Sequence, residues 1–470
     1  MQISHYNSLL YIFVGIVASA AIYFSHASGE GKSSFFYGGK SSFWLISALS
    51  FFAGSIVQFW ILLLPVLSLS HPAILVILSL IISVFVPIFL LKNRNTILNR
   101  FMELLSQKLK TIIFIVVVIF FVFIQPFALL YLGEKIIAQF FGGSYHFLLV
   151  FLIGISGLTT LIGGKKVVAF ANAMFGVTVI VAALVIMYLG NSVSAPLMFL
   201  QMLFTDGAQY FQNNNFVETN WIIGFIGFSI ITWWMWWIDN SAFHLQGKQS
   251  EQRNSNAVMF ASFSLIVIAL VVFPEQSFSG TAPADARVST SVMVNNELLS
   301  FFFVLGVVSV MVSAFSHSFQ NIASIVIVQF FHEQVQQSVE EKHILVARLV
   351  IVLSALLTIL YIPFAQLFGA ITLLVYVQYL ACFAASIVGV FTVFVLWKNY
   401  NKRGVATGII GGMTAGIIVV VLTYSGSEML TPLLATPYGA AAGIFLFSMV
   451  CSVGGSILVE RKITKRSVVV

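Results

Sequence analysis

Two features of the sequence could do chemistry: a Gly-Ser pair inside an apolar run, and a group of hydroxyls beside a histidine. Gly54 and Ser55 interrupt the apolar stretch 43–68, where two such residues weaken a helix at its centre. Ser313 and His317 are four residues apart, so they share one face of a helix. An imidazole within a membrane suits proton coupling or gating, because it titrates near neutral pH.

Each of these features also has a simpler structural explanation. Small residues let membrane helices pack closely without any break. The hydroxyls of Ser313, Ser316 and Ser318 can bond back to the preceding turn of their own helix. His317 can be a neutral side chain bonded to a neighbouring carbonyl. The surrounding sequence favours a broken helix at Gly54–Ser55, while the alternatives for the serines and the histidine stay open.

A cluster of tryptophans forms a third candidate. The segment is TWWMWWID, residues 232–239, and it lies at the end of another apolar run. Trp233 and Trp236 are three residues apart and share a helical face. They form either an aromatic belt at the membrane interface or a stacking and cation–π wall for a solute. Asp239 follows the cluster near water, so a charge at the interface is a simpler interpretation than a proton carrier.

The elements that position these residues must be membrane helices. The chain has 470 residues, of which 60% are hydrophobic and only 8% charged, and this excludes a soluble domain. Many apolar runs are long enough to cross a bilayer as helices, in which the backbone bonds internally. We predict an all-α integral membrane protein with about thirteen transmembrane helices, near 8–27, 43–68, 72–91, 111–132, 145–162, 168–189, 219–241, 257–274, 298–330, 344–363, 368–397, 405–423 and 438–459.

The basic residues orient these helices. Thirteen spans place the two termini on opposite sides. With the N-terminus outside, 20 of the 22 Lys and Arg residues lie inside, and only Lys135 and Arg287 lie outside. We therefore predict a multi-pass protein of the cell inner (plasma) membrane with a cytoplasmic C-terminus. The net charge of +7 follows from this bias and needs no nucleic-acid partner, so the expected partners are the lipid bilayer and a small-molecule solute.

The spans permit two five-helix repeats of opposite sense. No hydrophilic stretch is long enough for a separate domain, so residues 1–470 form a single polytopic domain. Spans two to six make one repeat and spans seven to eleven another, and the second is inverted because five is odd. The chain thus divides into an N-terminal extra helix and turn, the two repeats, and C-terminal extra helices with a basic tail, at 1–42, 43–189, 219–397 and 405–470.

Four segments, in chain order, resemble the sodium:solute symporter family. The family's opening turn and broken helix are similar to FFYGGKSSFWLISALSFFAGSIVQFW (35–60), and its Gly-Gly turn and following helix to LIGGKKVVAFANAMF (161–175). Its eighth core helix resembles VLGVVSVMVSAFSHSFQNIASIVIVQFF (304–331), and its tenth resembles YLACFAASIVGVFTVFVLWKNYNKRGVATGIIGG (379–412). The resemblance implies a LeuT-like fold with a core of two inverted five-helix repeats.

The resemblance also implies a sodium site and a solute site. Sodium would be bound by four residues, through the backbone carbonyls of Ala53, Ile56 and Val310 and the hydroxyl of Ser313. The solute would lie beside the break in the helix. The residues that we assign to it, the tryptophan cluster included, are Gly54, Ser55, Gln58, Trp60, Trp233 and Trp236.

Several positions depart from the family's pattern. The family places a second hydroxyl after the first, and here that residue is Ala314, so one of about five ion ligands is lost. An Asp of the family is replaced by Asn172, which removes a charge from the cation path. The family's Gln-Arg pair near the end of the seventh span is replaced by Ala242-Phe243. The departures predict a weakened Na⁺ site and leave His317, Asn172 and Asp239 as candidates for coupling or gating.

Together these patterns predict a secondary active transporter that moves a small neutral or zwitterionic solute by alternating access. No buried charge stands beside the break to pair with a strongly ionic ligand. No metal cluster, nucleophile elbow or phosphate loop suggests an enzyme, and Na⁺ is the one possible cofactor. The alternatives are a non-transporting solute sensor or accessory membrane protein on the same scaffold, a proton-coupled or uncoupled transporter, and a transporter of quaternary ammonium compounds that uses the tryptophan cluster.

Overall fold

In the computed structural model, every regular element among the described residues is a helix. Eight of the described segments are long and apolar enough to cross a membrane, by length and composition. The predicted spans 72–91 and 257–274 lie outside the described residues, so the count of thirteen stays a prediction. The described residues are 7–27, 34–37, 44–56, 100–141 except 102, 145–189, 226–233 except 228 and 232, 297–337, 339–397, 400–425 and 437–467.

The chain divides into two compact units, which are described one at a time. These units are sets of segments that pack together. The two predicted repeats are instead defined by the opposite directions in which their helices run through the membrane, so the units do not test them and the repeats stay a prediction. Unit 1 comprises Met1–Ala73, Val116–Ala208 and Phe243–Leu373. Unit 2 comprises Ile74–Ile115, Gln209–Ala242 and Leu374–Val470.

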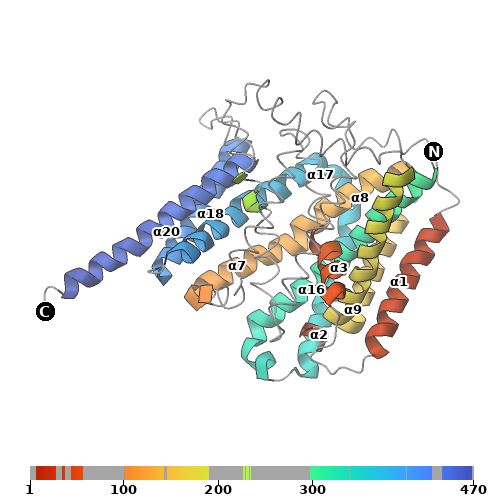
Figure 1. Ribbon diagram of the computed structural model, residues 1–470, viewed down its shortest axis with the longest axis horizontal. Helices are drawn as coiled ribbons and strands as arrows, with labels where there is room; N and C mark the ends of the chain where they lie inside the picture. The colour runs from red at the N-terminus through yellow and green to blue at the C-terminus, as the bar shows by residue number, and fades with distance from the viewer. Residues whose placement is uncertain are drawn as a thin grey trace. The chain divides into compact units, whose positions relative to one another are not determined.

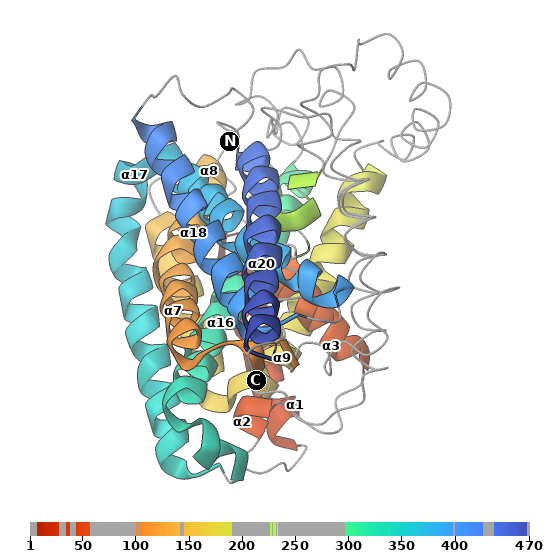
Figure 2. The same ribbon diagram turned by 90° about the vertical axis from the view of Figure 1, so that its left-hand side faces the viewer.

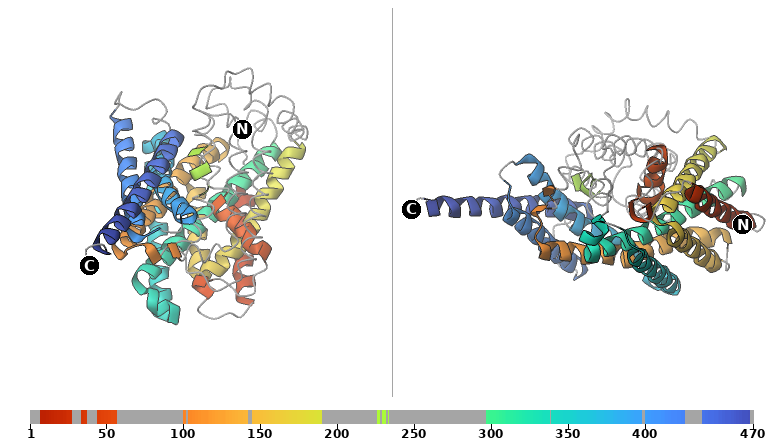
Figure 3. Two further views of the ribbon diagram at one scale, coloured as in Figure 1. Left: turned by 60° about the vertical axis from the view of Figure 1, so that its left-hand side comes forward. Right: turned by 90° about the horizontal axis from the view of Figure 1, so that it is seen from below.

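The centre of unit 1 is a pair of long helices, α9 (Tyr145–Leu189) and α16 (Glu297–Gln337), which pack against each other. Three N-terminal helices cover α9, namely α1 (Asn7–Ala27), α2 (Ser34–Tyr37) and α3 (Trp44–Phe51). Figure 1 and the left view of Figure 3 show these red helices beside the yellow α9. Large apolar side chains remain exposed on the outer faces, as expected of helices that contact lipid; examples are Ile16, Phe147 and Leu345.

The long helix α9 consists of two crossings joined by a turn. Gly164 interrupts it with a φ of 56° and a ψ of −144°. On one side of this kink, Thr160 Oγ1 donates a hydrogen bond to the carbonyl of Ser316, at 3.5 Å. On the other side of the kink, Asn172 of α9 and His317 of α16 both lie against Gly54 of the N-terminal segment. Both halves of α9 therefore reach the same level of α16, and the chain reverses at the Gly-Gly turn that the sequence predicts.

We expect Gly164→Ala to destabilise the protein by about 2–3 kcal/mol, because this backbone conformation is almost restricted to glycine. An added Cβ would also overlap the carbonyl oxygen and ring of Phe35. Thermal unfolding of the purified protein in detergent measures the effect. Gly154→Ala in the same helix is the matched control, because open space surrounds the added methyl group there. Equal unfolding temperatures for the two variants would contradict the prediction.

Phe35 of α2 contacts three other helices at this turn, namely α9, α16 and α17. Its carbonyl accepts a hydrogen bond from Gln320 Nε2 of α16, at 3.3 Å. The guanidinium of Arg348, in α17 (Glu341–Leu396), lies over its ring at 6.0 Å from the centroid. Arg348 Nε also donates to the carbonyl of Leu161 in α9, at 3.1 Å. The α9 turn is therefore fixed from both sides by polar contacts within unit 1.

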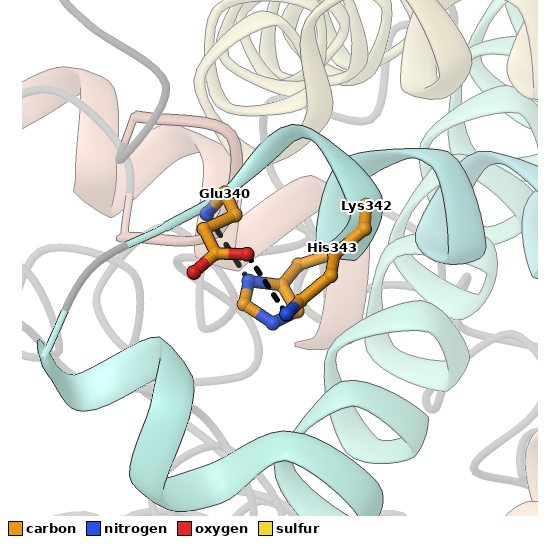
Figure 4. A network of polar contacts seen from close by, with 3 residues as sticks. All are labelled: Glu340, Lys342 and His343. Carbon is orange, nitrogen blue, oxygen red and sulfur yellow. Dashed lines mark hydrogen bonds and ion pairs between the residues drawn. The ribbon is translucent and has the colours of Figure 1, made fainter.

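A small network of polar contacts stabilises the N-terminus of α17 (Figure 4). The backbone N–H of Glu340 donates to His343 Nδ1 at 3.1 Å, and the Glu340 carboxylate pairs with Lys342 Nζ at 2.8 Å. The hydrogen bond and charge of Lys342 lower the pKa of Glu340. The pair therefore supports the helix start at neutral pH and loses its effect as the carboxylate is protonated in acid. Both side chains of the ion pair are exposed, so the contribution is small.

Unit 2 is built around α18 (Lys402–Tyr424) and α20 (Pro437–Ser467), which lie side by side (Figure 2). Asn401 caps α18, because its side chain accepts hydrogen bonds from the backbone N–H groups of Arg403 and Gly404. Ser452 Oγ donates to the carbonyl of Gly404 at 3.0 Å, and a Cβ on that glycine would overlap Ser456. Small residues thus allow the two helices to approach closely, as in many membrane helix pairs.

Candidate functional site

A π-helical segment, η1 (Phe52–Ile56), follows α3 where the sequence predicts a broken helix, and Gly54 lies at its middle. Such segments replace the usual backbone bonding over one turn and are frequent at functional sites. A Cβ on Gly54 would come within 2.8 Å of Asn172 Nδ2 and within 3.3 Å of both Cβ and Cγ of His317. Because Gly54 has no side chain, side chains from α9 and α16 can both approach its Cα closely. The sequence candidates Gly54, Asn172 and His317 are therefore brought together.

Asn172 is fully buried at this meeting point. Neither its Oδ1 nor its Nδ2 has a hydrogen-bond partner among the described residues. Each unsatisfied buried group is unfavourable by about 1–3 kcal/mol, and native proteins keep few of them. The helix α9 packs tightly on α3 near this point, because a Cβ on Gly176 would lie 2.8 Å from the carbonyl oxygen of Leu49 in α3. The free amide of Asn172 is thus held in place beside η1.

Ser313 differs from Ser309 and Ser316 of α16 in having no hydrogen-bond partner among the described residues. Its hydroxyl is fully buried and unbonded within the described chain. By contrast, Ser309 donates to its own preceding turn at 2.7 Å, and Ser316 donates to the carbonyl of Ser156 at 3.5 Å. The bond back to the helix backbone, which the sequence leaves open, is therefore not made by Ser313. Ser313 is one turn from His317, which faces η1, so its hydroxyl is available to a ligand on that side.

The positions assigned to sodium lie on two elements that pack together. Ala53 is fully buried in η1, and Val310 is buried in α16. Ile56 is the last residue of η1, and its side chain lies outside what the structure describes. Ala314 is fully buried next to Ser313 and offers no oxygen. The oxygens that the described residues offer to a cation here are neutral: backbone carbonyls, the Ser313 hydroxyl and the Asn172 amide.

A positive charge acts on this region. Lys165 is seven residues before Asn172, hence on the same face of α9, and it is close enough to His317 for its charge to act on the imidazole. Within the described segments, no group of three His, Cys, Asp or Glu side chains is placed to hold a metal. The ammonium of Lys165 disfavours a bound cation by Coulomb repulsion. The arrangement therefore suits a neutral ligand or a weakly bound monovalent cation.

Other sequence candidates are not part of this meeting point. The side chain of Ser55 lies outside the described residues, as do Gln58, Trp60, Trp236 and Asp239 in full. Trp233 belongs to unit 2, where its ring packs edge-to-face on Phe391 with 6.1 Å between centroids. The use of Trp233 and Trp236 as a wall for a solute stays a prediction.

Sequence reasoning missed Gln125. Its side chain is fully buried, and neither Oε1 nor Nε2 has a partner in the described part of the chain. The signal is visible in FFVFIQPFALL (120–130), where this glutamine and the following Pro126 interrupt an otherwise apolar run. A polar residue so placed in a membrane span is expected to have a function.

Comparisons with known proteins agree with this fold. No protein-family model matches the sequence. The sodium/myo-inositol cotransporter 2 of Bos taurus is 22% identical over 387 residues, and the sodium/glucose cotransporter 4 of Mus musculus is 20% identical over 391 residues. Each match covers 73% of this chain and 57% of the relative, so the chain spans little more than half the length of these relatives.

A solved structure is similar along nearly the whole chain. It is the substrate-bound, outward-open state of a Na⁺-coupled sialic acid symporter, with a TM-score of 0.65 and 15% identity. The alignment covers 95% of this chain and 97% of that one. The predicted LeuT-like fold is confirmed at this level: the chain is an all-helical, multi-pass membrane protein, and its relatives are transporters rather than enzymes.

Proposed function

We propose that this chain, a distant homologue of the sodium:solute symporters, is a secondary active transporter of a small neutral or zwitterionic solute. The observation that carries the proposal is the meeting of Gly54, Asn172 and His317 at η1, beside the unbonded hydroxyl of Ser313. Irregular helices in transporters bind ions and solutes near the middle of the membrane, because their backbone groups are not all committed to the helix. Alternating access would open this region to each side in turn.

Na⁺ is the coupling ion that we assign first. Its ligands would be the carbonyls of Ala53, Ile56 and Val310 and the hydroxyl of Ser313, and the unbonded state of that hydroxyl supports the assignment. Because Ala314 supplies no oxygen, the site lacks one ligand of about five. The unbonded Oδ1 of Asn172 is a candidate to replace it.

The solute would bind beside the same segment. The residues that we assign to it are Gly54, Ser55, Gln58, Trp60, Trp233 and Trp236. Two relatives are cotransporters of myo-inositol and glucose, and the structural neighbour carries sialic acid, so a small polar solute is the class that these likenesses support.

The finer topology belongs to the same proposal. We infer thirteen spans with an outside N-terminus, a cytoplasmic C-terminus and two inverted repeats, at 43–189 and 219–397, in a cell inner membrane. The distribution of Lys and Arg over the predicted loops supports this orientation.

A proton-coupled or uncoupled transporter is the second candidate, and the charge of Lys165 favours its uncoupled form, because it repels a bound Na⁺ and a protonated His317 alike. A cation site beside a fixed ammonium binds Na⁺ weakly. The proton-coupled form would require the Lys165 charge to move away from His317, which lies against η1, when the imidazole takes up a proton.

Uptake into proteoliposomes separates these functions. The purified full chain is reconstituted, and uptake of neutral, zwitterionic and acidic solutes is followed under imposed Na⁺ and H⁺ gradients. We expect the Na⁺ gradient to stimulate uptake of a neutral or zwitterionic solute. Uptake that ignores Na⁺ but is lost in His317→Ala indicates the proton-coupled form. Absence of uptake for every solute, with folded protein in the vesicles, contradicts the transporter and leaves a solute sensor or accessory protein.

A further inference from the structure

Arg348 is a charged residue within a membrane span of unit 1, and its side chain is exposed. The span is the first part of α17, Glu341–Phe364, which is long and apolar enough to cross a membrane. Arg348 is seven residues after Glu341, or about 10 Å along the axis. Ionisable residues within membrane spans usually face the interior of the bundle and pair there, because an unpaired charge is unfavourable in lipid. An arginine on the outer face of a span therefore needs an anion at the membrane surface.

Two contacts hold the guanidinium of Arg348 and leave its outer nitrogens free. Nε donates to the carbonyl of Leu161 at 3.1 Å, and the group lies over the ring of Phe35 at 6.0 Å from the centroid. The N–H groups on Nη1 and Nη2 have no partner among the described residues. The protein thus fixes the position of the guanidinium without satisfying its outer donors.

The ring beneath Arg348 is itself held firmly. Phe35 is buried, and its ring packs edge-to-face on Phe36 with 5.1 Å between centroids. Its carbonyl accepts a hydrogen bond from Gln320 Nε2 at 3.3 Å, and a Cβ on Gly164 would overlap both this carbonyl and the ring. A planar guanidinium over such a ring keeps the N–H groups in its plane available for bidentate binding of a phosphate.

The surface of α17 around Arg348 is apolar. Leu345 and Val352, three residues before and four after it, share its helical face, and Leu356 lies one turn farther along. These side chains are 63%, 40% and 53% exposed, so no described helix covers them. From Arg348 the stripe runs about 12 Å along α17 into the membrane span. A ligand with a charged head and an apolar chain matches both parts of this surface, whereas a free anion matches only the first.

The charges around Arg348 favour a ligand with a net negative charge. Lys165 and Lys166 lie at the α9 turn, four and five residues after the carbonyl that Arg348 binds. Two carboxylates lie at the start of α17: that of Glu340 is already paired with a lysine, and Glu341 is about 10 Å from Arg348 along the axis. Basic groups at a membrane surface attract acidic lipids, while the cationic part of a zwitterionic lipid offsets this attraction.

We propose that Arg348 binds the phosphate of an acidic phospholipid, whose acyl chain lies along Leu345, Val352 and Leu356. The two Nη groups donate parallel hydrogen bonds to two phosphate oxygens. Because the same guanidinium contacts α2 and the α9 turn, the bound lipid stabilises the contact of these elements with α17. The inference goes beyond the proposed function and is measured without transport.

Lipid titrations of the purified full chain in detergent test this site. The unfolding temperature is recorded with increasing phosphatidylglycerol, and with phosphatidylcholine of the same acyl chains, for the wild type and Arg348→Gln. We expect phosphatidylglycerol to raise the unfolding temperature of the wild type more than phosphatidylcholine does. Arg348→Gln should bind phosphatidylglycerol about tenfold or more weakly and lose this preference, because a charge-assisted bidentate pair is removed.

Three controls separate the site from general effects of charge. Arg403→Gln removes the same charge at another exposed position, in α18 of unit 2, and should keep the preference of the wild type. Arg348→Lys keeps the charge but not the planar fork, so it should weaken the binding of phosphatidylglycerol by a smaller factor than Arg348→Gln. Inorganic phosphate should not raise the unfolding temperature, because it has no acyl chain to lie on the apolar stripe.

Four results would overturn the inference. The first is a wild type that unfolds at the same temperature in both lipids, and the second is an equal loss of preference in Arg348→Gln and Arg403→Gln. The third is stabilisation by inorganic phosphate to the same extent as by phosphatidylglycerol. The fourth is a less stable Arg348→Gln with unchanged lipid preference, because the arginine then serves only the carbonyl of Leu161.

Two further comparisons keep the test decisive. If Arg348→Gln does not fold, Arg348→Lys decides alone, and an affinity for phosphatidylglycerol equal to that of the wild type overturns the bidentate site. Failure of uptake in proteoliposomes removes the proposed transport and leaves the lipid site standing, whereas loss of the lipid preference has the opposite consequence.

Discussion

Replacing Gly54 with valine should lower solute uptake by about 100-fold while the protein still inserts in the membrane. The Cβ alone would lie 2.8 Å from Asn172 Nδ2 and 3.3 Å from His317, and the branched methyl groups reach farther. Overpacking of this kind is unfavourable by about 1–3 kcal/mol. If the upper value acts on one state of the transport cycle, its population changes by roughly 100-fold. Initial uptake rates per amount of reconstituted protein measure the effect.

A matched glycine and a compensating change test the cause. Gly15→Val in α1 introduces the same side chain where nothing lies within 4 Å of the added Cβ, and it should transport like the wild type. In Gly54→Val, removal of the opposing amide by Asn172→Ala should recover part of the unfolding temperature but not uptake, because Asn172 belongs to the site. Normal uptake by Gly54→Val would show that the close approach at η1 has no part in transport.

Local features of the fold are predictable because they depend on neighbouring residues. Small residues in an apolar run indicate an irregular helix, and the π-helical segment η1 occurs at Gly54. Two adjacent glycines before a basic pair indicate a turn, and α9 reverses at Gly164. The spacing of Ser313 and His317 places them on one helical face without any knowledge of the fold.

Contacts between distant helices could not be predicted from these patterns. Asn172 is read from the sequence as the loss of a charge, but its approach to Gly54 depends on how α9 packs against α3. Whether Ser313 bonds its own helix depends on a rotamer that the sequence does not specify. Gln125 is one amide in an apolar run, and only its burial and missing partners in the structure distinguish it from a residue that faces a loop.

The unsatisfied groups of unit 1 imply a balance between stability and binding. Asn172, Ser313, Gln125 and Ser318 are each buried and unbonded within the described chain. A fold selected for stability alone would replace them with apolar residues of similar size, since each lowers stability without a ligand. Asn172, which lies against Gly54 of η1, and Ser313, one turn from His317, are therefore better explained by a ligand at η1 than by packing.

Substitutions at Ser313 and Ala314 should give the second large effect, which is a change in the apparent affinity for Na⁺. Ser313→Ala should weaken the apparent affinity for Na⁺ by roughly 10- to 100-fold, and Ala314→Ser should strengthen it by a similar factor, because an oxygen bound to a charge contributes about 1.5–3 kcal/mol. Uptake measured over a series of Na⁺ concentrations gives both affinities. Without Na⁺, Ser313→Ala should be no less stable than the wild type, since the hydroxyl it removes is unbonded.

Substitutions of the same kind elsewhere on α16 serve as controls. Ser309→Ala removes a hydroxyl that bonds its own helix, and Ala323→Ser adds one at another fully buried position, so neither should change the dependence on Na⁺. Equal effects of Ala314→Ser and Ala323→Ser would mean that position 314 does not face an ion. Opposite shifts at two adjacent residues cannot arise from a general loosening of α16, because loosening would weaken binding in both. They would require an ion beside Ser313, in a site that has kept its shape and lost one oxygen.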